Sequence, residues 1–458
     1  MTIDDVEDQL PKGSSPWSVW GVRLVALLTV AMAISLGFAW IQQSYRGVSV
    51  NTELSFPAND RPWMPVGTTP VPISGNHYFG DFQLPYGWAL NVRNSQSPYL
   101  SSEIPANYPP LSILFFVPFT IFPVKIATML FLLLSAVVFS LPLWLLLSPL
   151  RISYRCIMLA PIVLVTTPFL GMLDRGNNIG IAIGLIAWAA LAWRSERLLW
   201  CGVFLAAAIA LKAYPAVLLV VPIALRRYRF SALVATSALG INLLALAFIP
   251  GGYGKNLHAA VPAMTSQRLT NLSQFDSWSL YSLLPKTVGL LLGPDHASRF
   301  LFPSRILLWL PSILYLVLVF VIIRRQRVPQ WCWGALSLAS IQLVVPLSGA
   351  YTTGWACLAA IWFAWGSLIQ AEPITSDNEA VNKENMPLRI VLMLALSASL
   401  VPSIFRIYGT GGLSISATRF LSPALLFVTL CLALAKSLMP QETVSTLETA
   451  EEPAFLAA

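Results

Sequence analysis

Charged residues are scarce in this chain, and their scarcity excludes an ordinary soluble domain. Only 10% of the 458 residues are charged, whereas 56% are hydrophobic. Soluble domains carry about 25% charged residues. Apolar runs such as 24–41, 306–323 and 390–405 approach the ~20 residues that cross about 30 Å of hydrocarbon. Because backbone groups in lipid must bond within their own segment, these runs predict an all-α, polytopic membrane protein.

Nucleotide-binding and metal-binding motifs are also missing. The sequence contains no Walker, G-x-G-x-x-G or G-x-S-x-G motif and no zinc-ligand spacing. The five cysteines lie inside apolar runs, which indicates packing residues rather than a disulfide framework. We therefore expect no metal centre and no cofactor, although a divalent cation is left open. The net charge of +8 reflects basic residues at the ends of spans, so we expect no nucleic-acid partner.

Four basic clusters set the predicted topology. By the positive-inside rule they lie in the cytoplasm: Arg151/Arg155, Arg194/Arg197, Arg226/Arg227/Arg229 and Arg324/Arg325/Arg327. An even number of crossings between clusters gives about twelve spans in one domain over residues 20–437. The first run follows acidic rather than basic residues, so we interpret it as a retained span and not as a signal peptide. The predicted domain is flanked by cytoplasmic tails at 1–19 and 438–458.

The segment 109–122 does not fit this parity. It begins at Pro109-Pro110, contains Pro118, and at 1.5 Å per residue spans only about 21 Å as a helix. We predict a re-entrant or membrane-surface helix on the outer side. The alternative is a thirteenth full span.

The same topology sorts the ionisable residues. It leaves seven carboxylates outside the cytoplasm: Glu53, Asp60, Asp81, Glu103, Asp174, Asp276 and Asp295. The three histidines are also outside, all of them in the long extracytoplasmic loops 43–108 and 250–302. Cytoplasmic loops are mostly a few residues long and leave little room for a site. Any acid–base chemistry is therefore expected at the extracytoplasmic face.

Asp81 is the first candidate. It precedes a stretch, 86–94, that is suited to a short amphipathic helix lying on the membrane. A carboxylate held near the interface can take a proton from a sugar hydroxyl, as general-base catalysis requires. The other interpretation is a solvated loop aspartate or a helix N-cap.

Two inter-helix turns supply further candidates. Asp174 and Arg175 stand where a hydrophobic helix ends, and polar groups at membrane depth are often functional. Asn177 and the residues around it equally suit a capped turn. Lys212 closes the apolar run 198–211, where its ammonium could hold a lipid phosphate or merely snorkel to the interface. Asn271, Ser273 and Tyr351 lie in outer loops and are weaker substrate-binding candidates, because most such residues are solvated connections.

Taken in order, these pieces resemble bacterial glycosyltransferase family 87 of the GT-C superfamily. The residues that carry the likeness are Asp81, Ser97-Pro98-Tyr99, Tyr108-Pro109-Pro110, Gly176-Asn177 and Lys212-Ala213-Tyr214-Pro215. The resemblance covers roughly residues 20–350. Members often carry a later S-W-x-H stretch, where this chain has Ser348-Gly349-Ala350-Tyr351 and no histidine.

The resemblance implies a GT-C-like fold and a polyprenyl-phosphate sugar donor, often of mannose. It implies transfer of a hexose, with inversion, to a glycolipid or glycan acceptor outside the cytoplasm, at a bacterial inner membrane. By analogy Asp81 is the catalytic base, and Lys212 and Arg175 face the donor phosphate. Asp174, Asn177 and Tyr108 are then neighbours that bind substrate.

Two other functions remain open from the sequence. A transporter or flippase of a lipid-linked saccharide would show two related halves and ionisable groups at mid-membrane. Neither is evident. A polysaccharide polymerase or ligase would share the lipid donor and the outer active site, and is harder to separate from the leading hypothesis.

Overall fold

The computed structural model of the chain describes its helical framework. The described residues are 80–100, 105–148, 177–265, 305–344, 354–368, 385–400, 406–408 and 414–439, with isolated residues at 152, 155–156, 159, 280, 287–288 and 291–292. The predicted tails and most of the two long outer loops therefore lie outside the described residues.

The described elements are almost all helices. In chain order they are α4 (Gly80–Arg93), α5 (Pro110–Phe116), η2 (Val117–Ile121), α6 (Val124–Leu146), α9 (Ile179–Arg194), α10 (Leu198–Leu211), η3 (Tyr214–Leu219), α11 (Val220–Ala224), α12 (Tyr228–Ala247), α13 (Tyr253–Thr265), α17 (Arg305–Arg325), α18 (Gln330–Leu343), α19 (Gly354–Leu368), α21 (Met386–Leu400), β1 (Arg406–Tyr408), β2 (Ser414–Ser416) and α22 (Ala417–Leu438).

Long helices with apolar outer faces identify a helical membrane protein. Three of the described helical segments are long and apolar enough to cross a bilayer: Ile126–Leu146, Tyr228–Ala247 and Leu421–Leu438. Met129 on α6 is 71% exposed and Leu244 on α12 is 63% exposed. Exposed apolar surface of this kind suits contact with lipid rather than water. The number of spans, about twelve, stays a prediction.

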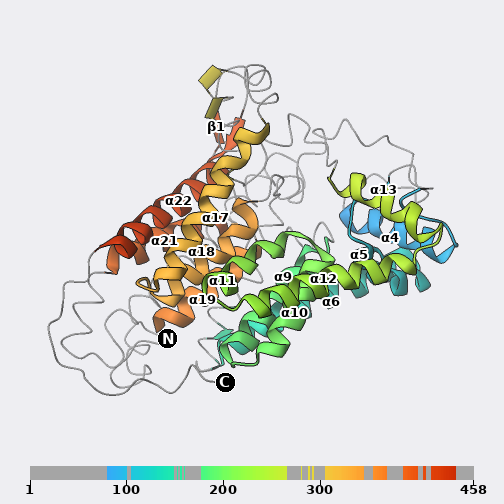
Figure 1. Cartoon of the computed structure of the whole chain (residues 1–458), viewed down its shortest axis with the longest axis horizontal. Helices are drawn as coiled ribbons and strands as arrows, with labels where there is room; N and C mark the ends of the chain where they lie inside the picture. The colour runs from blue at the N-terminus through green and yellow to red at the C-terminus, as the bar shows by residue number, and fades with distance from the viewer. Residues whose placement is uncertain are drawn as a thin grey trace, which may run out of the picture.

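The centre of the molecule is made by helices that bury most of their surface. α9 packs between α6 and α10, and α18 packs against α19. Every residue of α18 from Trp331 to Leu343 is buried except Trp333. Figure 1 shows the α6, α9, α10 and α12 group beside a second group that contains α17, α18, α19, α21 and α22. Small residues let α9 and α10 approach closely, as is usual between helices in membranes.

Arginines close the helix ends that the topology assigns to the cytoplasm. Arg324 donates to the carbonyl of Ala224 at 3.2 Å, at the end of α11. Arg325 donates to the carbonyl of Ser437 at 3.3 Å, at the end of α22. The last carbonyls of a helix have no partner within it, so these guanidinium groups satisfy them and join distant helices.

At the opposite ends of α10 and α12 lie the short helices of the predicted outer side. Figure 1 shows α4, α5 and α13 together there, far from β1 and α22. The segment predicted as 109–122 is a broken helix, α5 followed by the 3-10 helix η2. Its length, about 20 Å from the rise of the two helix types, is too short for an upright span. Its re-entrant placement remains a prediction.

Helix α4 differs from the sequence prediction of a helix at 86–94, because it begins at Gly80. Pro85 and Gly87 look like helix breakers in the sequence. Their cost is offset by packing, since Phe82 and Ala89 are fully buried against Phe116 and Phe131. One further departure from the all-α prediction is the hairpin of β1 and β2, paired antiparallel with Ile407 opposite Ile415.

The cysteines are free, but not all are packing residues as expected. Cys201, Cys332 and Cys357 are buried, whereas Cys156 and Cys431 are exposed. The exposed pair lies on helical segments, so an apolar run contributes to an outer face as well as to the core.

The crossing of α6 and α9 depends on Gly184. A Cβ at this position would lie 2.6 Å from the Val138 carbonyl oxygen, whereas a Cβ at Gly240 of α12 would meet nothing within 4 Å. We predict that Gly184→Ala lowers the free energy of unfolding by about 1–3 kcal/mol through overpacking. Gly240→Ala, the matched control, should raise it by about 0.5–1 kcal/mol through helix propensity. Thermal unfolding in detergent measures both, and an unchanged melting temperature for Gly184→Ala contradicts the prediction.

Candidate functional site

Lys212 stands at the outer end of α10, where it is the C-cap residue. Its backbone is extended (φ −144°, ψ 129°) and its N–H donates to the carbonyl of Ala208. The residue is only 7% exposed. A snorkelling lysine would carry its ammonium into water, so burial contradicts that interpretation. A cation at a helix C-terminus is also favoured by the helix dipole.

The ammonium of Lys212 lies on the face of an aromatic ring. Its Nζ is 3.4 Å from the centroid of the Tyr108 ring. A second ring, that of Tyr214, is 5.9 Å away. A cation within about 6 Å of a ring face is attracted by the quadrupole of the ring. Two residues that are 104 positions apart in the sequence, and that were predicted separately, therefore form one contact.

Tyr108 is itself fixed by its neighbours. Trp88 of α4 packs edge-on against the ring, with the centroids 5.4 Å apart. The phenolic oxygen accepts a hydrogen bond from Asn177 Nδ2 at 3.3 Å. The backbone carbonyl of Tyr108 accepts from the hydroxyl of Tyr99 at 2.9 Å. The S-P-Y and Y-P-P motifs are thus brought together in the structure.

Asn177 and Asn178 serve the start of α9 as well as the site. Asn177 Oδ1 accepts the N–H of Ile179 at 2.9 Å, which satisfies one of the orphan donors of the first turn. Asn178 Nδ2 donates to Ser112 Oγ of α5, and the buried Oδ1 of Asn178 has no hydrogen-bond partner. The structure therefore supports the turn interpretation of Asn177, and its role in substrate binding stays a prediction.

Sequence reasoning missed Asn242, which ties three helices together at this end. Its Oδ1 accepts the N–H of Leu111 at 3.1 Å, in the first turn of α5. Its Nδ2 donates to the carbonyl of Ala210 at 3.1 Å, in the last turn of α10. The available signal was an amide side chain inside the apolar run 231–249, since polar groups at membrane depth rarely lack a partner.

The outer loop is anchored to α13 through Ser97 and Asn256. Ser97 Oγ donates to Asn256 Oδ1 at 2.6 Å, and Asn256 Nδ2 donates to the carbonyls of Ile249 and Pro250. Gly251 lies close by with φ +104°. A Cβ at this position would lie only 2.9 Å from the Cβ of Ser97, which is too close for any other residue. Asn256 was also missed, because a loop asparagine carries no sequence signal of burial.

Asp81 is the second residue of α4, and its side chain lies outside what the structure describes. Position 81 is seven residues before Trp88, so the two positions share one face of the helix. That face also carries Leu84 and Val92, which pack in the same cluster as Trp88 and Tyr108. Two side chains hold α4 on η2 and the residue after it: Tyr86 Oη donates to the Phe122 carbonyl at 2.9 Å, and Arg93 donates to the Thr120 carbonyl.

The remaining predicted site residues are not placed. Asp174, Arg175, Asn271, Ser273 and Tyr351 lie outside the described residues. Among the residues that are described, no group of three or more His, Cys, Asp or Glu could hold a metal ion. The described part of the site therefore consists of one cation, two asparagines and an aromatic cluster, in which the ammonium of Lys212 is the group that could hold an anion such as a phosphate.

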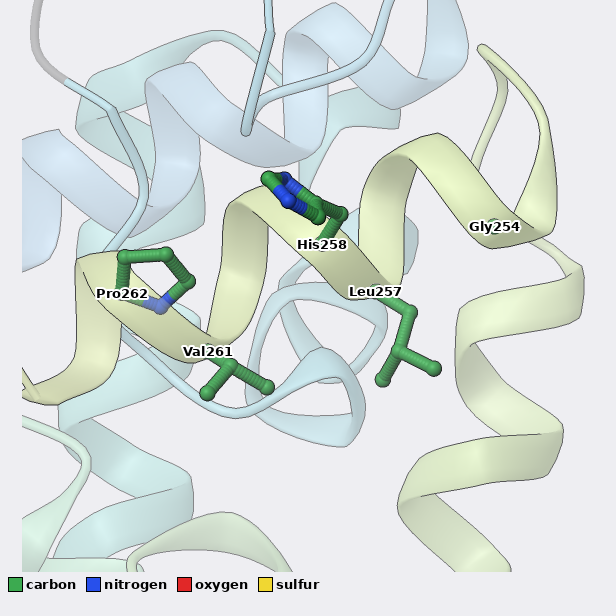
Figure 2. Close-up of a pocket in the computed structure, with 5 residues that line it drawn as sticks. All are labelled: Gly254, Leu257, His258, Val261 and Pro262. Atoms are coloured by element: carbon green, nitrogen blue, oxygen red, sulfur yellow. The ribbon is translucent and has the colours of Figure 1, made fainter.

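An open hollow of about 500 Å³ lies along α13. Figure 2 shows the five residues that line it on successive turns of that helix: Gly254, Leu257, His258, Val261 and Pro262. His258 is the one titratable side chain in this lining. The hollow is lined by α13 alone, whereas the two ring contacts of the Lys212 ammonium come from Tyr108 and Tyr214.

One comparison with known proteins gives a match. The family model of glycosyltransferase family 87 matches residues 107–348, just over half of the chain. The matched region starts one residue before Tyr108 and includes Asn177, Lys212 and Asn242, but not Asp81. No curated protein matches the chain.

Tyr99 offers a test of the outer loop by pH. Burial raises the pKa of Tyr99 above its ordinary value. The neutral phenol is thus favoured in the folded state, so its stabilisation is present below pH ~10 and is lost as the pH rises further. We predict that Tyr99→Phe is about 1 kcal/mol less stable than the wild type at pH 8, because it loses the bond to Tyr108.

Above pH 10 the two proteins should converge in stability. Thermal unfolding between pH 8 and 11 measures this. Tyr253→Phe is the control for the loss of a phenol hydroxyl, since Tyr253 is 44% exposed. Parallel profiles for Tyr99→Phe and the wild type would show that the Tyr99 hydroxyl does not titrate in this way.

Proposed function

Because the chain belongs to glycosyltransferase family 87 and is a glycosyltransferase, we propose that it transfers a hexose from a polyprenyl-phosphate sugar to an extracytoplasmic acceptor. Mannose is the candidate sugar, and a glycolipid or glycan is the candidate acceptor. The observation that carries the proposal is the buried ammonium of Lys212 at the predicted outer end of α10. Membership of the family favours sugar transfer over the flippase alternative.

Charge on the donor explains the need for that lysine. The phosphodiester of a lipid-linked sugar carries a negative charge, and the lipid phosphate gains another when the sugar leaves. It needs no proton to depart, so stabilisation falls to cationic groups placed in advance. A lysine acts on phosphate as a compact point charge. Arg175, four residues before the start of α9, is proposed as a second cation for the same phosphate.

The proposed reaction is a single displacement with inversion. The acceptor hydroxyl oxygen forms a bond to the anomeric carbon, the bond from that carbon to the phosphate oxygen breaks, and the hydroxyl proton passes to the carboxylate of Asp81. The lipid phosphate keeps the electron pair of the broken bond. General-base assistance of this kind contributes about 10²–10⁴ in rate.

The backbone of α4 supports this role for Asp81. Position 81 lies on the face of α4 that carries Trp88, and Trp88 packs on the tyrosine that holds Lys212. The base and the phosphate-binding cation would then belong to one continuous set of contacts. Asp174, Asn177, Asn271, Ser273 and Tyr351 are proposed as surrounding substrate-binding residues.

The proposed setting is the inner membrane of a bacterium, with the site on the extracytoplasmic side. Both the donor and a glycolipid acceptor would reach the site from the membrane. The arginines at the opposite helix ends fit the positive-inside rule and support this orientation. A polymerase or ligase would use the same donor, and the acceptor identified in the assay separates these from a simple transferase.

Replacement of the base is the first test. Asp81→Asn should reduce kcat for sugar transfer from a polyprenyl-phosphate mannose by at least about 10²-fold, because the amide cannot take the hydroxyl proton. Transfer of radiolabelled sugar by purified protein in detergent measures it. Asp60→Asn, in the same outer loop, is the control and should retain activity. Full turnover by Asp81→Asn with a normal melting temperature would remove Asp81 as the base.

Replacement of the cation is the second test. Lys212→Met should raise the donor KM by at least about tenfold, because a charge-assisted contact to phosphate is worth roughly 1.5–3 kcal/mol, and Lys212→Arg should retain part of the affinity. Lys255→Met is the matched control, since Lys255 is exposed on α13. The phosphate role is wrong if donor KM in Lys212→Met equals that of the control.

A further inference from the structure

Of the two described rings near the Lys212 ammonium, that of Tyr108 is the nearer. The Nζ lies 3.4 Å from the Tyr108 centroid, which is van der Waals contact with the ring face. Tyr214, two residues after the lysine, is 5.9 Å from the same atom, at the edge of the range for such attraction. Both rings carry the same chemistry, so the difference in distance makes Tyr108 the stronger of these two ring contacts.

A tyrosine can fix a cation only if its own ring cannot turn away. Here the ring is held at its edge by Trp88 and at its hydroxyl by Asn177. Its backbone is held by Tyr99, and Pro109 follows it with φ fixed at −55°. These contacts come from α4, from the start of α9 and from the loop, so the ring is tied to three separate segments.

The lysine needs such a partner because its side chain is long and flexible. A lysine loses about 2 kcal/mol of rotamer freedom when its ammonium is fixed in one place. An aromatic face attracts the ammonium without neutralising it, in contrast to a carboxylate. The positive charge is then both located and retained, as preorganised stabilisation of a leaving phosphate requires.

We propose that Tyr108 is a positioning residue that seats the Lys212 ammonium by a cation–π contact and so sets its affinity for the donor phosphate. This proposal rests on the function proposed above. The expectation that Tyr108 also contacts the substrate stays a prediction. One face of its ring is covered by the lysine, and its hydroxyl accepts a bond from Asn177.

The test changes the π-electron density of the ring and keeps its shape. Phenylalanine and its mono-, di- and trifluorinated analogues are placed at position 108 by nonsense suppression in the full-length chain. Each fluorine withdraws electron density from the ring face, so donor KM should rise stepwise, on the order of tenfold across the series. The kcat should fall as well, because the seated ammonium also stabilises the leaving phosphate. All four variants lack the hydroxyl, so its loss is constant.

Two controls make the result specific. The same series at Tyr214, the more distant ring, should leave KM unchanged. The Tyr108 series should also lose its effect when it is repeated in Lys212→Met, as a double-mutant cycle requires. A flat KM series at Tyr108 in the wild-type background overturns the positioning role, provided that Lys212→Met itself raises KM.

Thermal stability separates a failure of the proposed function from a failure of the Tyr108 positioning role. If Lys212→Met leaves donor KM unchanged, the phosphate role of the lysine fails, and thermal unfolding of the same fluorinated series still reports the contact. The melting temperature should then fall stepwise with fluorination in the wild-type background and stay level in Lys212→Met. A level melting temperature in both backgrounds shows that the ring does not seat the ammonium.

Discussion

A polar group buried among apolar helices must find a partner, and this constraint organises the predicted outer end of the molecule. Helix ends there expose backbone donors and acceptors that lipid cannot satisfy. Asn242 meets the constraint between α5 and α10, and Asn177 meets it at the first turn of α9. Lys212 meets it on the ring of Tyr108. The bonds of Asn242 and the contact of Lys212 join segments that are far apart in the sequence.

The same contacts that complete the helix ends also build the site. Asn177 accepts the first N–H of α9 and donates to the hydroxyl of Tyr108, and Tyr99 donates to the carbonyl of Tyr108. A catalytic cation is most effective when it is held in place before the substrate arrives. In this chain that preorganisation follows from ordinary satisfaction of backbone and amide groups, so the fold and the proposed chemistry share their supports.

The sequence predicted much of this, but only as separate pieces. Low charge and long apolar runs predicted the helical membrane protein. Polar residues at span ends made Asn177 and Lys212 candidates, and the family resemblance added Tyr108. Their contact could not be predicted, because it depends on the packing of α5, α9 and α10 rather than on any local pattern. The burial of Lys212 could not be predicted either. A lysine at the end of an apolar run gives the same sequence pattern whether its ammonium reaches water or packs inside the protein.

Other features could not be predicted from the sequence, for identifiable physical reasons. The first turns of α4 were not predicted because Pro85 and Gly87 have poor helix propensity, which the packing of Phe82 outweighs. Asn242 lay in an apolar run and was read as part of the span, and the pairing of β1 with β2 gave no alternating pattern in three residues each. Tertiary contacts decided each of these positions.

The arrangement also suggests why the proposed base and the proposed cation stand on different elements. Lys212 belongs to α10, which packs in the core against α9 and α12, whereas position 81 belongs to α4, a short helix docked on the broken helix of α5 and η2. A lipid phosphate arrives from the membrane and needs a rigid site at the bundle. An acceptor is better served by a peripheral helix that can be varied without disturbing the bundle. The contact of Trp88 with Tyr108 couples the two, because it places the face of α4 that includes position 81 against the ring that seats the cation.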